Sequence, residues 1–143
     1  MAHYVATVPS TMSAENAFAY MSDLRNFGEW DRGIKKVEQI KGDGPGLGAI
    51  CDITVRGAGG RDDVLRYETL EFESPRTILV KGRNNKFTSI DRVTVTPTEN
   101  GCDVTYDATL TANGIYFFMN IALAKVFNKV GDAAIAGLRK KLA

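Results

Sequence analysis

The chain has 143 residues and carries 18 basic against 17 acidic side chains, for a net charge of +1 at pH 7. A chain of this length buries roughly 68% of its extended surface on folding, so one domain over residues 1–143 can form a stable core without disulfides or bound metals. The balanced charge gives no basic surface of the kind that nucleic acid or an anionic membrane attracts. We therefore expect a soluble protein without a nucleic-acid partner.

Only two cysteines are present, Cys51 and Cys102, and they fall in different predicted strands. No disulfide framework is expected from them, and a reducing compartment is the default. Residues 1–10 show no basic segment followed by an apolar run, and no stretch approaches the roughly 18 apolar residues of a spanning helix. The expectation is a cytoplasmic protein with no stable membrane insertion.

The first thirty residues predict one strand and two helices. Residues 3–8 alternate weakly and end at Pro9, which is typical of a short edge strand. Ser10, Thr11 or Ser13 then caps a helix whose apolar side chains recur at helical spacing. Asn26 and Gly28 interrupt the next segment, for which we predict a turn and a short second helix that brings Trp30 against the core.

Six strands are predicted between Ile34 and Thr111, over residues 34–41, 49–55, 63–73, 76–83, 87–97 and 102–111. In the second of these, Cys51, Ile53 and Val55 alternate with polar residues, so one face is apolar. In the third, Leu70 and Phe72 break the alternation that Leu65 and Tyr67 begin. This break in parity predicts a β-bulge.

The last two strands turn polar side chains toward the interior. Val93 and Val95 are expected to share a face with Val104 and Tyr106, because either plausible turn length between the strands gives this parity. The same alternation turns Ser89 and Asp91 inward. A bulge near Ile90 is the alternative, and it would turn Asp91 out to solvent.

The chain ends in a segment that predicts one long amphipathic helix from Asn113, its N-cap, to Leu142. An apolar stripe is expected to face the sheet, and it consists of Met119, Leu123, Val126, Phe127, Val130, Ala133, Ala134, Gly137 and Leu138. The charged side chains Lys125, Lys129, Asp132, Arg139 and Lys140 fall opposite or on its flank. At about 1.5 Å per residue this helix is roughly 40 Å long, so it must cross the whole sheet.

The predicted order is strand, two helices, six antiparallel strands and a long helix, which is an α+β arrangement. A curved antiparallel sheet wrapped around one long helix cannot be filled everywhere. We expect a cavity where the helix and the sheet diverge.

Several segments carry a resemblance to a known family. They are Ser13 to Phe18 followed by Asp23, Asn26 and Trp30, the turn from Gly44 to Ala49, and Glu73 to Arg76. Together with the order of elements, they resemble the polyketide cyclase/dehydrase and lipid transport family (SRPBCC), of the START-like or Bet v 1-like superfamily. The resemblance covers essentially the whole chain and implies a helix-grip fold with a seven-stranded sheet and an internal pocket for a hydrophobic small molecule. It implies no shared catalytic motif.

Two other kinds of site are excluded. The segment Gly44 to Ala49 formally satisfies the dinucleotide fingerprint, but an alternating strand follows it where the fingerprint needs a helix N-terminus for the pyrophosphate. His3 is the only histidine and lies near the N-terminus, so no zinc site can be assembled from it and the two cysteines. Neither a cofactor nor a metal is therefore expected.

The missing interior histidine leaves carboxylates and tyrosines as the candidates for chemistry. An inward Asp91 among apolar neighbours should have a raised pKa, which is how a general acid or base is made. Tyr67 and Tyr106 could polarise a ligand carbonyl, with Ser89 as a supporting hydroxyl. As alternatives, both tyrosines serve only as core residues with satisfied hydroxyls, or as lining of a pocket.

The start of the last helix is apolar nearly all round, from Ile115 to Ile121. We expect Phe117, Phe118 or both to pack under the short helices at residues 23–30 as a lid. A dimer contact or a hydrophobic entrance is the alternative.

The function expected is binding of a hydrophobic or amphipathic small molecule, lipid-like or aromatic, by a monomer or weak homodimer. The alternative is a cyclase or dehydratase in which Asp91 and a tyrosine transfer protons. The cavity residues expected are Trp30, Ile53, Val55, Tyr67, Asp91, Tyr106, Met119, Leu123 and Phe127.

Overall fold

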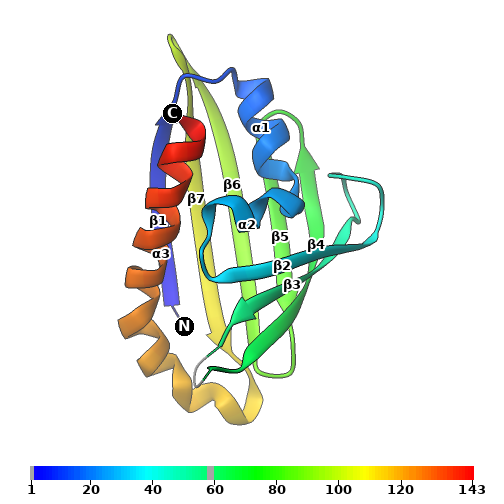
Figure 1. Cartoon of the computed structure of the whole chain (residues 1–143), viewed down its shortest axis with the longest axis vertical. Helices are drawn as coiled ribbons and strands as arrows, with labels where there is room; N and C mark the ends of the chain where they lie inside the picture. The colour runs from blue at the N-terminus through cyan, green and yellow to red at the C-terminus, as the bar shows by residue number, and fades with distance from the viewer. Residues whose placement is uncertain (1, 58–59) are drawn as a thin grey trace.

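A computed structural model describes residues 2–57 and 60–143, apart from the side chain of Lys125. Its elements are β1 (Ala2–Ser10), α1 (Ala14–Ser22), η1 (Leu24–Asn26), α2 (Phe27–Trp30), β2 (Ile34–Lys41), β3 (Ile50–Arg56), β4 (Asp62–Glu73), β5 (Thr77–Arg83), β6 (Phe87–Thr98), β7 (Gly101–Ala112), η3 (Gly114–Met119) and α3 (Asn120–Leu142). Figure 1 shows the curved sheet with α3 running along β1 and the short helices in front of the strands.

The sheet has seven strands in the order β1-β7-β6-β5-β4-β3-β2, and every neighbouring pair is antiparallel. The two strands that flank the short helices in sequence, β1 and β2, therefore lie at opposite edges of the sheet. The predicted helix-grip architecture, with its long C-terminal helix and two short helices between the first two strands, is confirmed.

The strand registers show which side chains of β4 and β6 face the interior of the sheet. The pairing of β4 with β5 shifts between Thr69 and Glu71, so the bulge predicted from Leu70 and Phe72 is confirmed. The pairing of β6 with β5 and β7 runs through Ile90 without a shift. Asp91 therefore stays on the inner face, and the alternative that a bulge turns it outward is wrong.

The short helices begin and pack as their sequence indicates. The Ser13 side chain caps α1 by accepting a hydrogen bond from the backbone N–H of Asn16, at 3.1 Å. Phe18 and Met21 on α1 are buried in the core, together with Trp30 at the end of α2. α1 packs on β6 and β7, and α2 packs on β2 and α3.

The glycine-dense segment before β3 is a loop. Gly42, Gly44 and Gly48 adopt positive φ values of 91°, 89° and 81°, a region that favours glycine. The segment leads directly into β3 and not into a helix. The helix N-terminus that a dinucleotide fingerprint requires is thus missing at this loop.

The C-terminal segment differs from the prediction of a single α-helix. Residues Gly114–Met119 form the 3₁₀ helix η3, and α3 begins only at Asn120. Asn113 precedes η3 without capping it: its side chain accepts a hydrogen bond from the Thr88 hydroxyl at 2.9 Å and donates one to the Asn84 carbonyl at 3.3 Å. The prediction that Asn113 caps the α-helix is wrong, because the turn after Asn84 competes for its side chain.

The apolar stripe of α3 is buried only toward its C-terminal end. Ala134 and Leu138 are buried as predicted, and so are Ile135 and Leu142, which the predicted stripe omitted. Val126 and Val130 are about half exposed but line the cavity that faces the sheet, whereas Ala133 is exposed and lies outside the cavity lining, so its predicted place on the sheet-facing stripe is wrong. The predicted place of Lys125 on the polar face lies outside the described side chains.

The predicted lid is also wrong. Phe117 and Phe118 have relative exposures of 70% and 74%, and neither packs under the short helices. The residues that do turn inward from this region are Tyr116 and Met119. The 3₁₀ turn is the reason, because its threefold periodicity puts Tyr116 and Met119 on one face and leaves the phenylalanines on the others.

Two further expectations can be compared with the structure. Cys51 and Cys102 are both free, as expected, and both are buried. Among the described helices, none combines the length and the apolar character needed to cross a bilayer.

Candidate functional site

A cavity of about 480 Å³ lies where α3 and the sheet diverge. Its walls are mostly apolar and come from β1, α2, β2, β3, β4, β6, β7 and the η3–α3 segment. The apolar lining residues include Phe27, Ile34, Ile53, Val55, Leu65, Phe87, Ala108, Leu110, Met119, Leu123, Phe127 and Ala134. A pocket with apolar walls and a few convergent polar groups is the usual form of a small-molecule site.

Most of the predicted cavity residues lie on this wall: Ile53, Val55, Tyr67, Asp91, Tyr106, Met119, Leu123 and Phe127. Trp30 does not. It is buried behind the wall, where its ring packs against Phe27 and Tyr106 with centroid distances of 5.2 and 5.5 Å. Trp30 therefore supports the wall, whereas whether the other residues contact a ligand stays a prediction.

Asp91 is the most deeply placed polar group of the cavity, with a relative exposure of 4%. The Ser89 hydroxyl donates a hydrogen bond to Oδ1 of Asp91 at 3.0 Å, and the Tyr106 hydroxyl donates one to Oδ2 at 2.8 Å. Each carboxylate oxygen thus has one protein donor. Because a carboxylate has about four acceptor positions, capacity remains for a donor from a bound molecule.

Burial raises the pKa of Asp91 to about 6, and the negative charges of Asp31 and Asp107 act in the same direction. The hydrogen bonds from Tyr106 and Ser89 oppose this shift. The pKa of Tyr106 lies well above its usual value, first because of burial and then because of the Asp91 charge, and that of Tyr67 is raised for the same reasons in the same order. Both tyrosines are therefore neutral donors at physiological pH.

Tyr67 owes its position to a glycine on the neighbouring strand. Gly82 is paired with Tyr67 across β4 and β5, and a Cβ atom at Gly82 would overlap the tyrosine ring. The ring therefore lies flat over this glycine, with its hydroxyl directed toward the group around Asp91. This pairing fixes one wall of the polar end of the cavity.

The sequence reasoning missed several lining residues, among them Asp31 and Phe87. Asp31, just after α2, lines the cavity, and burial raises its pKa while a hydrogen bond from the Gly33 N–H at 2.9 Å lowers it. No pattern marks Asp31, because it lies in a turn. Phe87 could have been found, since it shares the alternation of Ser89 and Asp91 along β6.

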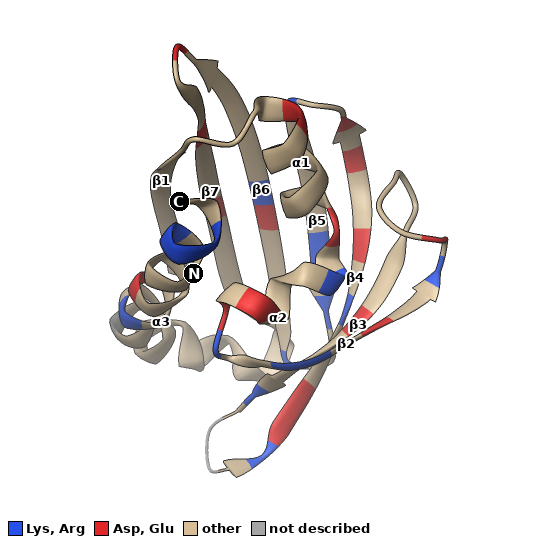
Figure 2. Cartoon of the chain, turned by 45° about the horizontal axis from the view of Figure 1, so that its top comes forward, with Lys and Arg blue, Asp and Glu red and all other residues tan. Residues whose placement is uncertain are grey.

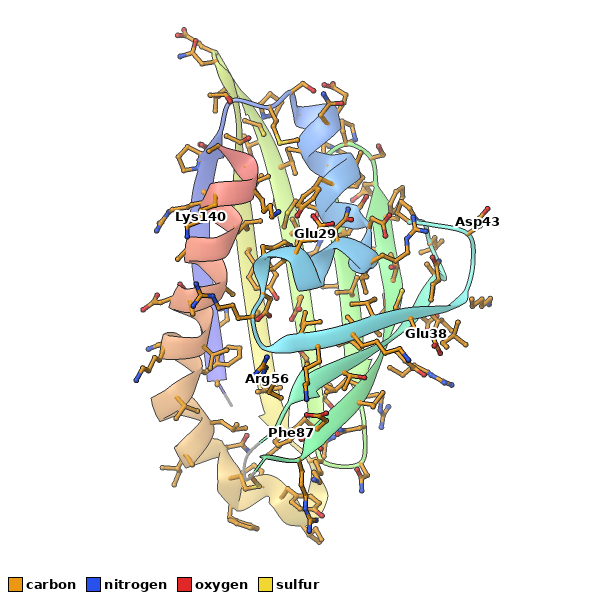
Figure 3. All side chains as sticks on the ribbon, viewed as in Figure 1. Glu29, Glu38, Asp43, Arg56, Phe87 and Lys140 are labelled. Carbon is orange, nitrogen blue, oxygen red and sulfur yellow. The ribbon has the colours of Figure 1, made fainter. Side chains whose placement is uncertain are left out.

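Basic side chains line the other end of the cavity. Arg56 and Arg61 are exposed and flank the connection between β3 and β4, and Lys86 precedes β6. Lys86 pairs with Asp63 at 3.3 Å, while the two arginines have no carboxylate within 4 Å among the described residues. Figure 3 shows Arg56 and Phe87 in the lower half of the molecule, toward η3. We call Arg56, Arg61 and Lys86 the basic rim.

The fold and this cavity define a helix-grip protein of the START-like class. The family described as "Polyketide cyclase / dehydrase and lipid transport" matches residues 1–143, and the chain belongs to that family. No curated protein matches the sequence.

Solved structures share the fold at low sequence identity. A START superfamily protein of Mycobacterium smegmatis has a TM-score of 0.77 at 15% identity, with 98% of this chain and 96% of that chain covered. A protein of Thermus thermophilus, TTHA0849, has a TM-score of 0.75 at 13% identity, with 99% and 95% covered. The di-domain ARO/CYC StfQ of the steffimycin biosynthetic pathway has a TM-score of 0.71 at 12% identity, with 98% and 50% covered. At these identities the likeness shows the fold alone.

Proposed function

We propose that this protein binds a hydrophobic or amphipathic small molecule, lipid-like or aromatic, in the cavity under α3. The observation that carries the proposal is the cavity of about 480 Å³, whose wall is mostly apolar. Binding of an apolar molecule in such a cavity is favourable, because each Å² of apolar surface removed from water contributes about 25 cal/mol. The described range of the family, from cyclase to lipid transport, fits this proposal.

Filling the cavity with a side chain tests the proposal. Ala108 lies buried on the cavity wall, so an Ala108→Trp substitution should place an indole in the space that the ligand would occupy. Binding of the apolar fluorescent probe N-phenyl-1-naphthylamine should then weaken at least tenfold. Ala136, an exposed residue of α3, provides the matched control, and Ala136→Trp should bind the probe like the parent protein.

Two results would contradict this proposal. One is a parent protein that does not bind the probe, and the other is equal binding by the parent and Ala108→Trp proteins. Circular dichroism of each variant establishes that it is folded. Native mass spectrometry of protein purified without detergent should in addition reveal a co-purified molecule, which the Ala108→Trp protein should lack.

A second candidate function is proton-transfer catalysis of the cyclase or dehydratase kind. Asp91 supports it, because a buried carboxyl with a pKa of about 6 and a tyrosine donor at 2.8 Å can act as a general acid or base near neutral pH. Incubation of the co-purified molecule with the protein in D₂O separates the two functions. If the protein is an enzyme, the molecule should gain deuterium with the parent protein and gain none with the Asp91→Asn protein. If the protein is a carrier, the molecule should stay unlabelled with both.

We further propose that the protein acts in the cytoplasm as a monomer or weak homodimer. The two free, buried cysteines fit a reducing compartment.

A further inference from the structure

The cavity is chemically polarised along its length. At one end lie Asp91, Ser89, Tyr67 and Tyr106, together with Asp31, and we call these five residues the acceptor end. At the other end lies the basic rim. Lys86 of the rim precedes Asp91 by five residues, which separates these two residues by about 16 Å along an extended strand.

The acceptor end has more acceptors than donors. The Ser89 and Tyr106 hydroxyls are both used on Asp91. One oxygen of Asp31 accepts from the Gly33 N–H, and the second has no partner among the described residues. Of the hydroxyl donors at this end, the Tyr67 hydroxyl alone remains. The two carboxylates therefore have more free acceptor positions than this end has free donors.

Within the described part of the chain, no cation compensates this end. Neither Asp31 nor Asp91 has a basic nitrogen within 4 Å among these residues, and the charged groups that act on Asp91 are the carboxylates Asp31 and Asp107. A buried charge without a partner is costly, and a bound group that donates hydrogen bonds or carries a positive charge would reduce that cost. A carboxylate or phosphate placed here would raise it.

We propose that the ligand carries a hydrogen-bond donor, a hydroxyl or an ammonium group, at the end that reaches Asp91, on an otherwise apolar body. This inference rests on the proposed function and names the class of molecule that the cavity selects. An anionic lipid can then enter only with its charge at the basic rim. The donor-bearing end therefore faces inward, and the orientation of the ligand is fixed.

Four probes with the same twelve-carbon chain test the proposal: dodecanol, dodecylamine, dodecanoate and the methyl ether of dodecanol. Each is used to displace N-phenyl-1-naphthylamine from the protein. The alcohol and the amine should displace the fluorescent probe at concentrations about tenfold or more below that needed for the ether. The reason is that a hydrogen bond to a charged group strengthens binding by about this factor. The ether keeps the oxygen and loses only the donor.

The Asp91→Asn protein should lose most of the preference for the amine over the ether, to within about threefold, while its affinity for the ether stays unchanged. Dodecanoate should respond little to Asp91→Asn, because its carboxylate lies at the basic rim. Asp43→Asn is the matched control, since Asp43 is an exposed carboxylate on a distant loop (Figure 3) and should change none of the four affinities.

The outcomes separate this inference from the proposed function. Binding of all four probes without a preference for the donors, or a preference that Asp91→Asn leaves intact, would overturn the inference alone. If the protein binds neither the fluorescent probe nor any of the four twelve-carbon probes, the proposed function and the inference are both overturned.

Discussion

The environment of Asp91 disfavours the charged form of its carboxyl. Its carboxyl is buried among apolar side chains, and its two hydrogen bonds come from the neutral hydroxyls of Ser89 and Tyr106. The folded state therefore favours the protonated form of Asp91 more than the unfolded state does. Ionisation of Asp91 at neutral pH costs stability, and a buried carboxyl with a perturbed pKa that lines a cavity is a candidate for function.

This environment predicts a pH dependence of stability. The pKa of Asp91 is about 6 in the folded protein and 3.8 in the reference state, so the folded state holds more protons between these values. Its contribution to the free energy of unfolding is then present below pH 4 and is lost as the pH rises to 6, by about 3 kcal/mol. Urea unfolding of the parent and Asp91→Asn proteins from pH 3.5 to 7.5 should show this decline in their difference.

Asp52 is the matched control for this measurement. Its hydrogen bond from Arg66 lowers the pKa of the Asp52 carboxyl, so its stabilising contribution is present above pH 4 and is lost as the pH falls further. Asp52→Asn should therefore give a difference of the opposite slope, confined to the acid end. A flat difference profile for Asp91→Asn across pH 4 to 6 would show that its carboxyl is not buried as described.

At the scale of elements, α3 is anchored at its first residue, where the Asn120 side chain accepts a hydrogen bond from the Ala112 N–H at 2.8 Å, and then in its second half. The Tyr4 hydroxyl donates to Asp132 at 2.7 Å, and the Ser10 hydroxyl donates to the Leu142 carbonyl at 2.6 Å. Gly137 lies so close to α2 that a Cβ atom there would overlap the Trp30 carbonyl oxygen. These contacts hold the end of α3 against β1 and α2, while its first half spans the cavity.

The contact at Gly137 predicts a reversal of the usual helix propensity. Replacing a helical glycine by alanine ordinarily stabilises a helix by about 1 kcal/mol. Gly137→Ala should instead lower the free energy of unfolding by about 1–2 kcal/mol, because α3 must move away from α2 to relieve the overlap. Urea unfolding measures the change.

Gly28→Ala in α2 is the control for that substitution. The nearest atom to a Cβ at Gly28 is a methyl of Ile34 at 3.5 Å, an ordinary contact, so no loss of stability is expected. A Gly137→Ala protein as stable as the parent would mean that α3 does not approach α2 this closely.

Element by element, the sequence predicts the sheet more completely than the last helix. Alternation identifies the strands, and its break at Leu70 and Phe72 locates the bulge, because side-chain parity follows directly from pairing. The η3 segment could not be anticipated, since an all-round apolar run gives no helical face to choose. The site follows the same division: Asp91 was found by parity, whereas Asp31 lies in a turn that carries no such signal.

For the whole molecule, charge and packing are distributed unevenly. Lys and Arg residues are scattered over the strands and collect at the C-terminal end of α3 (Figure 2). There the positive charges of Arg139, Lys140 and Lys141 interact favourably with the helix dipole. The buried core gathers around the short helices and the end of α3. The η3 segment and the first half of α3 instead expose large apolar side chains, among them Ile115, Phe117, Phe118, Ile121, Val126 and Val130.

This distribution predicts where the molecule opens. Amides of residues 114–130 should exchange with deuterium at least tenfold faster than those of residues 132–142, because few buried contacts hold the first segment. Dodecanol should slow exchange in residues 114–130 preferentially. Mass spectrometry of peptides from both segments measures this, with the Ala108→Trp protein as the control that dodecanol leaves unchanged. Uniform exchange along the whole helix would contradict the prediction.

The distance between the acceptor end and the basic rim has a kinetic consequence. A molecule of the proposed kind that arrives through the rim must carry its hydroxyl or ammonium group, stripped of water, past apolar side chains before Asp91 can receive it. The same barrier opposes departure. A protein with such a cavity would load and unload its ligand slowly.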